Sequence, residues 1–261
     1  MKNFNHNHST LKRKLQGQEL SLGSWLTIPH QAVIEILSTA GFEWLVIDME
    51  HSPISIETTM NLIGHIQGNG MQALVRVSKN EEVIIKQVLD AGADGIVIPM
   101  IKNKAEAIEA VNYAKYPPKG KRGVGLNRAQ KYGAAFDSYQ EWADKEITII
   151  AQIEHIDAVT NLNEILNVDG VDGIIVGPYD LSASMGYPGE YDRDDVKEAL
   201  EKIDIITKKN NKPLGFHVVD SNHEKVLEKI QKGYSFLAFS LDFFFLGDKA
   251  REEMKQLKLK A

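Results

Sequence analysis

Two carboxylates follow neighbouring buried strands in the middle of the chain. The apolar run at residues 147–153 is followed directly by Glu154, and the run at 173–176 is followed closely by Asp180. Residues 157–166 between them carry apolar side chains at helical spacing, which predicts a strand, a helix and a second strand. Parallel strands about 5 Å apart end at one edge of a sheet, so both carboxylates could reach a single hard cation. Either carboxylate alone is more simply a helix or turn cap, but the pair favours a metal site.

Polar groups beside these carboxylates extend the candidate site. Gln152 lies two positions before Glu154, on the same face of the strand, and can only donate or accept hydrogen bonds. Gly177 and Pro178 let the backbone turn sharply and would aim N–H groups beside Asp180. Such a group of donors is a suitable cradle for an anion.

A histidine and an arginine follow two earlier strands. Asp48 and His51 come after the apolar run at 44–47, and the imidazole is a candidate general base whose ring Asp48 could orient. The simpler alternative is a histidine that is satisfied by its own turn. Arg76 follows the run at 73–75 and would direct a cation at the same edge, although an ion pair across the rim explains it equally well.

Other titratable residues give weaker signals. Lys79 and Lys102 lie beyond their strands, so a lysine that could form a Schiff base inside the site is not apparent. Asp90 ends a predicted helix, and the residues alone suggest a structural role for it.

Composition limits the class of protein. The chain has 261 residues, 43% of them hydrophobic, which suffices for one sizeable core and is close to the usual length of a (β/α)8 barrel. Its formal charge of −6 includes no basic stripe, so no nucleic-acid partner is expected. The absence of cysteine excludes thiolate chemistry. The polar, basic start predicts no secretory signal, and no apolar run is long enough for a membrane span, so a soluble cytoplasmic protein is expected.

A weak internal repeat indicates the fold. Four segments share a helix end, a glycine and a buried strand, and they start at Ala40, Ala91, Asp169 and Lys232. Further apolar strands are predicted near 20–26, 73–77, 147–153 and 213–218, which makes eight. Helical patterns lie at 32–39, 56–67, 81–91, 104–114, 157–166, 194–208, 224–232 and 244–257.

This alternation predicts one closed α/β barrel. Eight strand–helix units at this length favour a single (β/α)8 barrel over an open sheet. We expect the barrel domain to span residues 20–261, after a polar N-terminal segment at 1–19. The long connection at 116–144, which contains Pro117-Pro118 and several glycines, is expected to be a lid or an entrance wall.

Taken together, these segments resemble the HpcH/HpaI family of metal-dependent pyruvate aldolases. The resemblance covers residues 23–242 and is carried by GSWLTI, AGFEWLVIDMEHSP, VRV, IKQVLDAGADGIVIPM, YPPKGKRGVG, QIE and VDGIIVGPYDLSASMG. The set in this order is highly specific, although each piece alone is weak. The family fold is a (β/α)8 barrel, which agrees with the strand count made from the sequence.

The resemblance implies a role for each candidate residue. It makes Glu154 and Asp180 the ligands of a divalent metal and His51 the catalytic base, with Asp48 as its partner. The other matches are Arg76 and Gln152 as contacts to pyruvate or its enolate, Asp90 as a second acid near the histidine, Trp25 as an aromatic wall, and the backbone of Gly177, Pro178, Tyr179 and Asp180 as the grip on the pyruvate carboxylate. Tyr179 stands where the family often has a small residue, so a narrower pocket is expected there, and Met49 replaces a common glycine.

The expected reaction follows from these residue types. Breaking the C3–C4 bond of a 4-hydroxy-2-oxo acid leaves two electrons on pyruvate as an enolate, and Mg²⁺, Mn²⁺ or Co²⁺ would spread that charge. Arg76 would add fixed positive charge, and His51 would remove the C4 hydroxyl proton. The resemblance thus implies a retro-aldol lyase that releases pyruvate and an aldehyde.

Two alternatives remain at this stage. A carbon–carbon lyase like the citrate lyase β subunit would act on a coenzyme A thioester, but it would need a basic groove and no Lys/Arg cluster follows the strands. A catalytically silent binding barrel would more readily have lost His51, Arg76 or a metal carboxylate.

The last predicted helix suggests assembly. It is preceded by Phe243 and opens with Phe244, Phe245 and Leu246, and one helix face cannot bury them all because consecutive residues point about 100° apart. The leftover patch would mark a subunit interface, unless the aromatic rings fill the barrel bottom. The resemblance implies trimers or hexamers with a terminal helix exchanged between subunits, so we expect a homo-oligomer, with a hexamer favoured.

Overall fold

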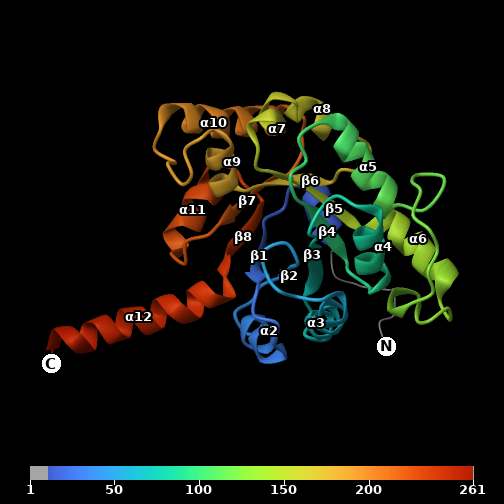
Figure 1. The fold of residues 1–261 in the computed structure, drawn as a ribbon, viewed down its shortest axis with the longest axis horizontal. Coiled ribbons are helices and arrows are strands. Elements are labelled where there is room, and N and C mark those ends of the chain that lie inside the picture. Colours follow the sequence, from blue (N-terminus) through green and yellow to red (C-terminus); the bar gives the residue numbers. More distant parts are fainter. Residues whose placement is uncertain (1–10, 261) are drawn as a thin grey trace.

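The computed structural model, which describes residues 11–260, is a closed barrel of parallel strands (Figure 1). Strand order follows chain order, and the last strand pairs with the first. The strands are β1 Ser21–Leu26, β2 Trp44–Asp48, β3 Gln72–Arg76, β4 Gly95–Ile98, β5 Thr148–Ile153, β6 Gly173–Val176, β7 Leu214–Val218 and β8 Phe236–Leu241. All eight expected strands are present, which confirms the predicted (β/α)8 barrel.

Helices cover the outside of the barrel (Figure 1). Several start where a polar side chain accepts a backbone N–H, as Ser55, Asn103 and Asn222 do. Several also end just before a glycine with positive φ, such as Gly92 and Gly233. The helices expected from the sequence are α2 Gln31–Ser38, α3 Ile56–Gly68, α4 Glu82–Asp90, α5 Lys104–Ala114, α10 Asp194–Lys209, α11 His223–Gln231 and α12 Asp242–Lys260.

The long connection after α5 has more structure than the sequence predicted. It contains the short 3-10 helix η1 Arg128–Gln130 and a full helix, α6 Phe136–Glu146, which lies on the outside of the barrel (Figure 1). The Arg128 guanidinium fastens the connection by donating to the Ala91 carbonyl at 3.0 Å and to Gln67 at 3.1 Å.

The segment predicted as one helix at 157–166 forms two short helices. These are α7 Ile156–Thr160 and α8 Leu162–Leu166, and Asn161 separates them. Asn161 has a non-helical conformation and donates to the Lys102 carbonyl at 3.0 Å. Its side chain therefore ties the break to the loop after β4.

Glycine makes room for large rings in the lower barrel interior. A Cβ at Gly23 would lie 2.0 Å from the Trp44 ring, and one at Gly215 would lie 2.8 Å from the Phe236 ring. Trp44 and Phe236 are both fully buried and stack with ring centroids 4.6 Å apart. The interior is thus a packed core below the strand ends.

The N-terminal helix α1 Leu11–Gln16 is part of this core. Leu11 and Leu15 are 3% and 1% exposed and belong to the same interior cluster as Trp44 and Phe236. Lys12 donates to the Ile147 carbonyl at 3.0 Å and pairs with Asp172 at 3.1 Å. The segment predicted as polar before residue 20 therefore carries an apolar face that packs into the barrel. The prediction of a polar segment at residues 1–10 lies outside the described residues.

The C-terminal helix α12 leaves the barrel and projects away from it (Figure 1). Asp242 fixes its start by accepting the N–H groups of Thr27 and Ile28 at 2.8 and 2.7 Å. Phe245 packs edge-on against Phe239, with centroids 5.0 Å apart. Among residues 11–260 no helix is both long and apolar enough to cross a membrane.

Candidate active site

Alternate residues of each strand point into the barrel, and this places the polar candidates at one mouth. Trp44, Val46, Leu74 and Ile150 line the interior, so residues two positions further along the strands face inward above them. Those residues include Asp48 on β2, Arg76 on β3 and Gln152 on β5, all of them buried. The register pairs Asp48 with Arg76 on adjacent strands.

Asp48 and Arg76 form a buried bidentate ion pair. Arg76 Nε lies 3.0 Å from Asp48 Oδ1, and its Nη2 lies 2.7 Å from Oδ2. The Arg76 side chain is 9% exposed and the Asp48 side chain 2%, so solvent screens the pair little. Burial alone would raise the pKa of Asp48, but the bonds and charge of Arg76 and two backbone N–H donors hold it below its ordinary value. The guanidinium is therefore fixed in position.

The structure does not form the expected contact between Asp48 and the ring of His51. Among residues 11–260, Asp48 accepts hydrogen bonds only from Arg76 and from the backbone N–H groups of Glu50 and His51. The His51 side chain is 64% exposed, and its Nε2 lies 3.6 Å from Glu50 Oε2. Asp48 pairs with Arg76 because that cation is the nearer and stronger partner. The carboxylate beside the imidazole is instead that of Glu50.

Glu50 is a site residue that the sequence reasoning missed. Its Oε2 lies 3.2 Å from Arg76 Nη1, is shielded from solvent and has no hydrogen-bond partner of good geometry among the described residues. Burial raises the pKa of Glu50; the charge of Arg76 opposes this rise, while Asp48 and Asp180 add to it. The signal was its place between Asp48 and His51, two residues after the first and directly before the second.

Glu154 and Gln152 stand together at the end of β5. Glu154 is 3% exposed, accepts the N–H of Met100 at 2.7 Å and accepts from Gln152 Nε2 at 2.5 Å. Met100 has a φ of 56°, an uncommon conformation for a residue with a side chain, and its N–H is thereby directed at the carboxylate. Burial, with the nearby charges of Glu50 and Asp180, raises the pKa of Glu154 to about 7 against the effect of this hydrogen bond.

Asp180 lies in the first turn of a short helix, α9 Pro178–Ser184, which the sequence suggested only as a turn. Its side chain is exposed, and its charge influences the titration of both Glu50 and Glu154, so the three carboxylates are neighbours. Gly177 precedes the helix, and a Cβ there would lie 3.0 Å from Glu154 Oε2. A larger residue would therefore push into the carboxylate.

Tyr179 does not line a buried pocket. Its ring is 55% exposed and lies beside Gly189 in the connection to α10. The narrower pocket expected from this residue stays a prediction.

Asp90 is not brought to this site within the chain. It ends α4, beside the start of β4, whereas the other candidates follow the ends of strands. Its Oδ1 accepts from Arg122 at 2.6 Å and from Gln130 at 3.2 Å, and both partners are buried. Within this chain Asp90 therefore anchors the connection after α5, and its role as an acid near His51 stays a prediction from the resemblance.

Trp25 and His217 form a second pair at the mouth, and sequence reasoning missed the histidine. The rings stack with centroids 4.5 Å apart and an interplanar angle of 13°. The Arg76 guanidinium lies over the Trp25 ring at 5.2 Å. His217 is the fourth of the five residues of β7 and so lies within the strand, not after it, which is why the search for residues that follow a strand missed it.

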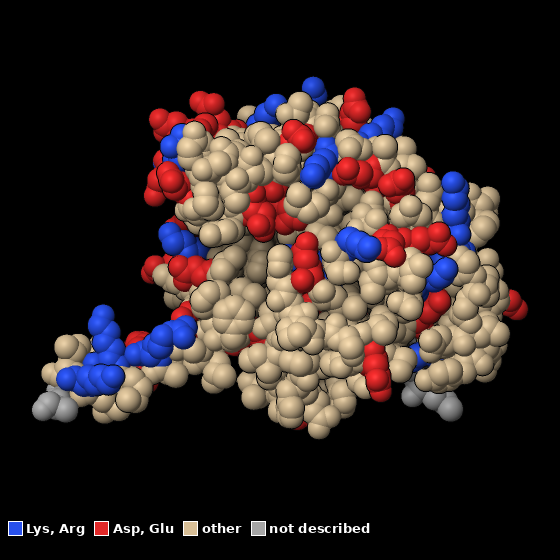
Figure 2. Space-filling model, in the orientation of Figure 1, with Lys and Arg blue, Asp and Glu red and all other residues tan. Residues whose placement is uncertain are grey.

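The mouth fits a divalent cation with few protein ligands. Among residues 11–260 no three His, Asp or Glu side chains are close enough to hold a metal ion by themselves. Gln152 Oε1 is nevertheless buried without a partner, and Glu154 is a buried carboxylate beside two others. Figure 2 shows acidic side chains gathered in a hollow near α9. Such a donor set suits Mg²⁺ or Mn²⁺, which keep waters and bind substrate oxygens.

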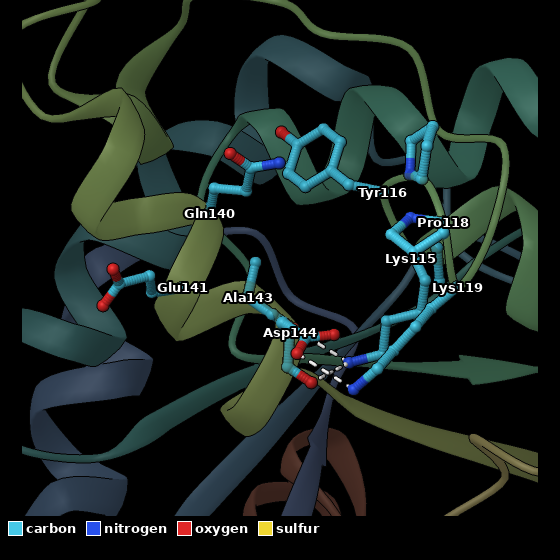
Figure 3. A pocket seen from close by; sticks show the side chains of 10 residues that line it. Lys115, Tyr116, Pro118, Lys119, Gln140, Glu141, Ala143 and Asp144 are labelled. Carbon is cyan, nitrogen blue, oxygen red and sulfur yellow. Dashed lines mark hydrogen bonds and ion pairs between the residues drawn. The ribbon is translucent and has the colours of Figure 1, made fainter.

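A cavity of about 240 Å³ between the end of α5 and α6 holds a buried lysine (Figure 3). Burial and the charge of Lys12 lower the pKa of Lys115 to about 8. Its Nζ donates to the carbonyls of Ala143 and Asp144 at 2.8 and 3.0 Å. Both bonds tie Lys115 to α6 on the outside of the barrel, so the lysine has a structural role.

Comparison with known proteins identifies the group to which this barrel belongs. Residues 21–246 match the HpcH/HpaI aldolase/citrate lyase family. The chain is 36% identical to a 2-dehydro-3,6-dideoxy-6-sulfogluconate aldolase of Pseudomonas putida, over 94% of this chain and 95% of that one. It is also 36% identical to a 4-hydroxy-2-oxo-heptane-1,7-dioate aldolase of Escherichia coli, over 90% and 89%.

A solved structure agrees with the sequence matches. The crystal structure of an HpcH/HpaI aldolase/citrate lyase family protein from Burkholderia cenocepacia superimposes with a TM-score of 0.90 and 30% identity, over 95% of this chain and 98% of that one. The chain belongs to the HpcH/HpaI aldolase/citrate lyase family, and it is a carbon–carbon lyase.

Proposed function

We propose that this protein is a divalent-metal-dependent aldolase that cleaves a 4-hydroxy-2-oxo acid to pyruvate and an aldehyde, and catalyses the reverse addition. The observation that carries the proposal is a fixed Arg76 cation, held by Asp48, facing a mouth that also holds Gln152, Glu154 and Asp180. The relatives named above are aldolases, and the name of the second specifies a 4-hydroxy-2-oxo acid.

Glu154 and Asp180 would hold the metal ion, with Gln152 beside it. Mg²⁺, Mn²⁺ or Co²⁺ bound there would act as a Lewis acid that stabilises the enolate charge. The raised pKa of Glu154 supports this assignment, because burial beside other carboxylates leaves that group in need of a cation.

The chain's own residues would bind the pyruvate half around that ion. Arg76 offers donors at the 2-oxo oxygen, and its ion pair with Asp48 keeps them preorganised. The backbone N–H groups at the start of α9 would grip the carboxylate, next to Gly177. The indole of Trp25 would form an apolar wall.

His51 would act as the general base. It would take the proton of the C4 hydroxyl, directly or through a water, while the C3–C4 bond breaks and its electron pair passes to pyruvate as the enolate. Protonation of C3 then completes pyruvate. An exposed imidazole beside Glu50 can return its proton to solvent between turnovers.

The coenzyme A alternative finds no support at this mouth. The hollow near α9 in Figure 2 is lined by acidic side chains, whereas a nucleotide would need basic ones.

A screen of 4-hydroxy-2-oxo acids tests the proposal directly. We expect pyruvate to be released from at least one of them, detected by oxidation of NADH in a coupled lactate dehydrogenase assay. Exchange of the pyruvate methyl protons with deuterated water is expected even without an aldehyde. The absence of both reactions in the metal-supplied protein would reject the function.

We propose further that the protein is a homo-oligomer, a trimer or hexamer, in which α12 contacts another chain. Leu246, Met254, Leu257 and Leu259 on this projecting helix are each more than half exposed. Lys and Arg side chains also lie along this helix (Figure 2). In a single chain the helix would therefore be solvated, but its apolar side chains would have nothing to pack against.

Light scattering tests the assembly. We expect a mass several times 29.2 kDa at micromolar concentration, and a smaller mass for Leu257→Glu. Gln256→Glu adds the same charge at the adjacent exposed position and should leave the mass unchanged. A wild-type particle of monomer mass would contradict the proposal.

A further inference from the structure

His217 is a partly buried titratable group at the mouth that the proposed reaction does not use. It lies on β7, next to β6 and to Gly177 beyond it, and its ring stacks on Trp25. Arg76 lies over the same indole at 5.2 Å. The indole thus contacts the guanidinium of the pyruvate subsite and, through its stack, the imidazole.

The hydrogen bonding of His217 determines its tautomer. Its Nε2 lies 3.2 Å from the Ser240 carbonyl oxygen, which can only accept, so Nε2 carries the proton. Burial, together with the charge of Arg76, lowers the pKa of His217 to about 4. The ring is therefore neutral at pH 7. Nδ1 is then an unprotonated acceptor. It has no hydrogen-bond partner within the described part of the chain, and the residue is only partly buried.

A β-bulge supports this orientation of the ring. The register between β1 and β8 shifts between Gly23 and Trp25, where β8 inserts an extra residue. Ser240 within that irregularity has a φ of 54°, which is rare for a residue with a side chain, and its Oγ is tied to the Val219 carbonyl at 3.1 Å. Bulges at barrel rims re-aim groups beside active sites, and here the re-aimed group is the carbonyl that holds His217.

The Trp25 indole adds a second unsatisfied group. Its Nε1 is buried and has no hydrogen-bond partner among residues 11–260. The stacked pair therefore combines a donor and an acceptor that the chain leaves unpaired, next to the subsite for pyruvate. A purely apolar aldehyde would leave both unpaired, whereas a hydroxyl group can donate and accept.

We propose that His217 is a specificity-determining residue that accepts a hydrogen bond from a hydroxyl on the aldehyde half of the substrate, so that the preferred aldehydes are 2-hydroxyaldehydes. This inference rests on the proposed aldolase function and goes beyond it, since it concerns the half of the substrate that Arg76 and the metal do not contact. A neutral acceptor also disfavours an aldehyde that would place a carboxylate at this position.

The test compares two aldehydes of equal size in aldol addition to pyruvate. Glycolaldehyde carries the hydroxyl, and propanal has a methyl group in its place. The ratio of their kcat/KM values is expected to fall about tenfold in His217→Phe, which keeps an aromatic ring on Trp25 but removes the acceptor. His217→Gln keeps an acceptor, so its ratio should stay within about threefold of the wild-type ratio. His65→Phe makes the same replacement on the exposed side of α3 and should not change the ratio.

The outcomes separate the inference from the function. An unchanged ratio in His217→Phe, or equal losses in His217→Phe and His217→Gln, would overturn the inference while pyruvate proton exchange still upheld the function. A wild-type protein without exchange or cleavage would overturn both. If His217→Phe does not fold, the wild-type protein alone decides, because a higher KM for glycolaldehyde than for propanal would contradict a hydroxyl contact.

Discussion

Removal of divalent metal ions with EDTA is expected to abolish pyruvate release, and addition of Mg²⁺, Mn²⁺ or Co²⁺ to restore it. The physical reason is the charge at the mouth: Glu154 is buried beside Glu50 and Asp180, and Arg76 is already neutralised by its bidentate contact with Asp48. Without a further cation the enolate would form among uncompensated carboxylates. The measurement is the coupled pyruvate assay on dialysed protein, with each metal titrated back.

Two variants and one trapping experiment make this prediction specific. Glu154→Gln keeps the size of the side chain but removes its charge, so it should lose both metal binding and activity, whereas Glu141→Gln on the exposed face of α6 should lose neither. Borohydride added with substrate should leave the protein unmodified. Lys115 and Lys229 have pKa values lowered to about 8, so trapping of pyruvate on either lysine would contradict the metal mechanism.

The second large effect is expected from His51→Ala, which should reduce aldol cleavage by about 10²–10⁴ as for loss of a general base. Of His51 and His217, which both lie near the mouth, His51 is the one available for this role. The proton of His217 Nε2 is committed to Ser240, and its lowered pKa makes it a weak base, while the His51 ring is 64% exposed.

The kinetic comparison separates a base from a structural residue. Proton exchange at the pyruvate methyl group need not fall in parallel with cleavage, because it does not require removal of the C4 hydroxyl proton. His65→Ala, on the exposed side of α3, provides the control. Near-normal cleavage by His51→Ala would assign the base to another group.

The barrel and its strand-end residues could be predicted because they depend on local patterns. Apolar runs that follow a glycine predict buried parallel strands, and the residue after each run must lie at the carboxyl edge of the sheet. Asp48, Arg76, Glu154 and Asp180 are found by this rule, since chain order alone places them at one mouth. The resemblance to a known family added roles to these positions, and it alone brought Trp25 and Asp90 into the predicted site.

The partners of these side chains could not be predicted, because they depend on distances across the barrel. Sequence spacing paired Asp48 with His51, three residues away, whereas the parallel register brings Arg76 opposite Asp48 and the stronger ion pair forms. Asp90 does not lie at the carboxyl ends of the strands, because its helix runs back along the barrel and places it beside Arg122.

The sequence by itself therefore determined the alternation of strands and helices, the barrel, and the carboxylates and cation at its mouth. Tertiary structure alone decided that α1 joins the interior core, that Glu50 contacts Arg76, and that His217 faces Trp25. The physical reason is the range of the forces involved. Backbone and apolar periodicity act between residues close in sequence, whereas closure of β8 on β1, with the bulge at Ser240, brings together side chains some two hundred residues apart.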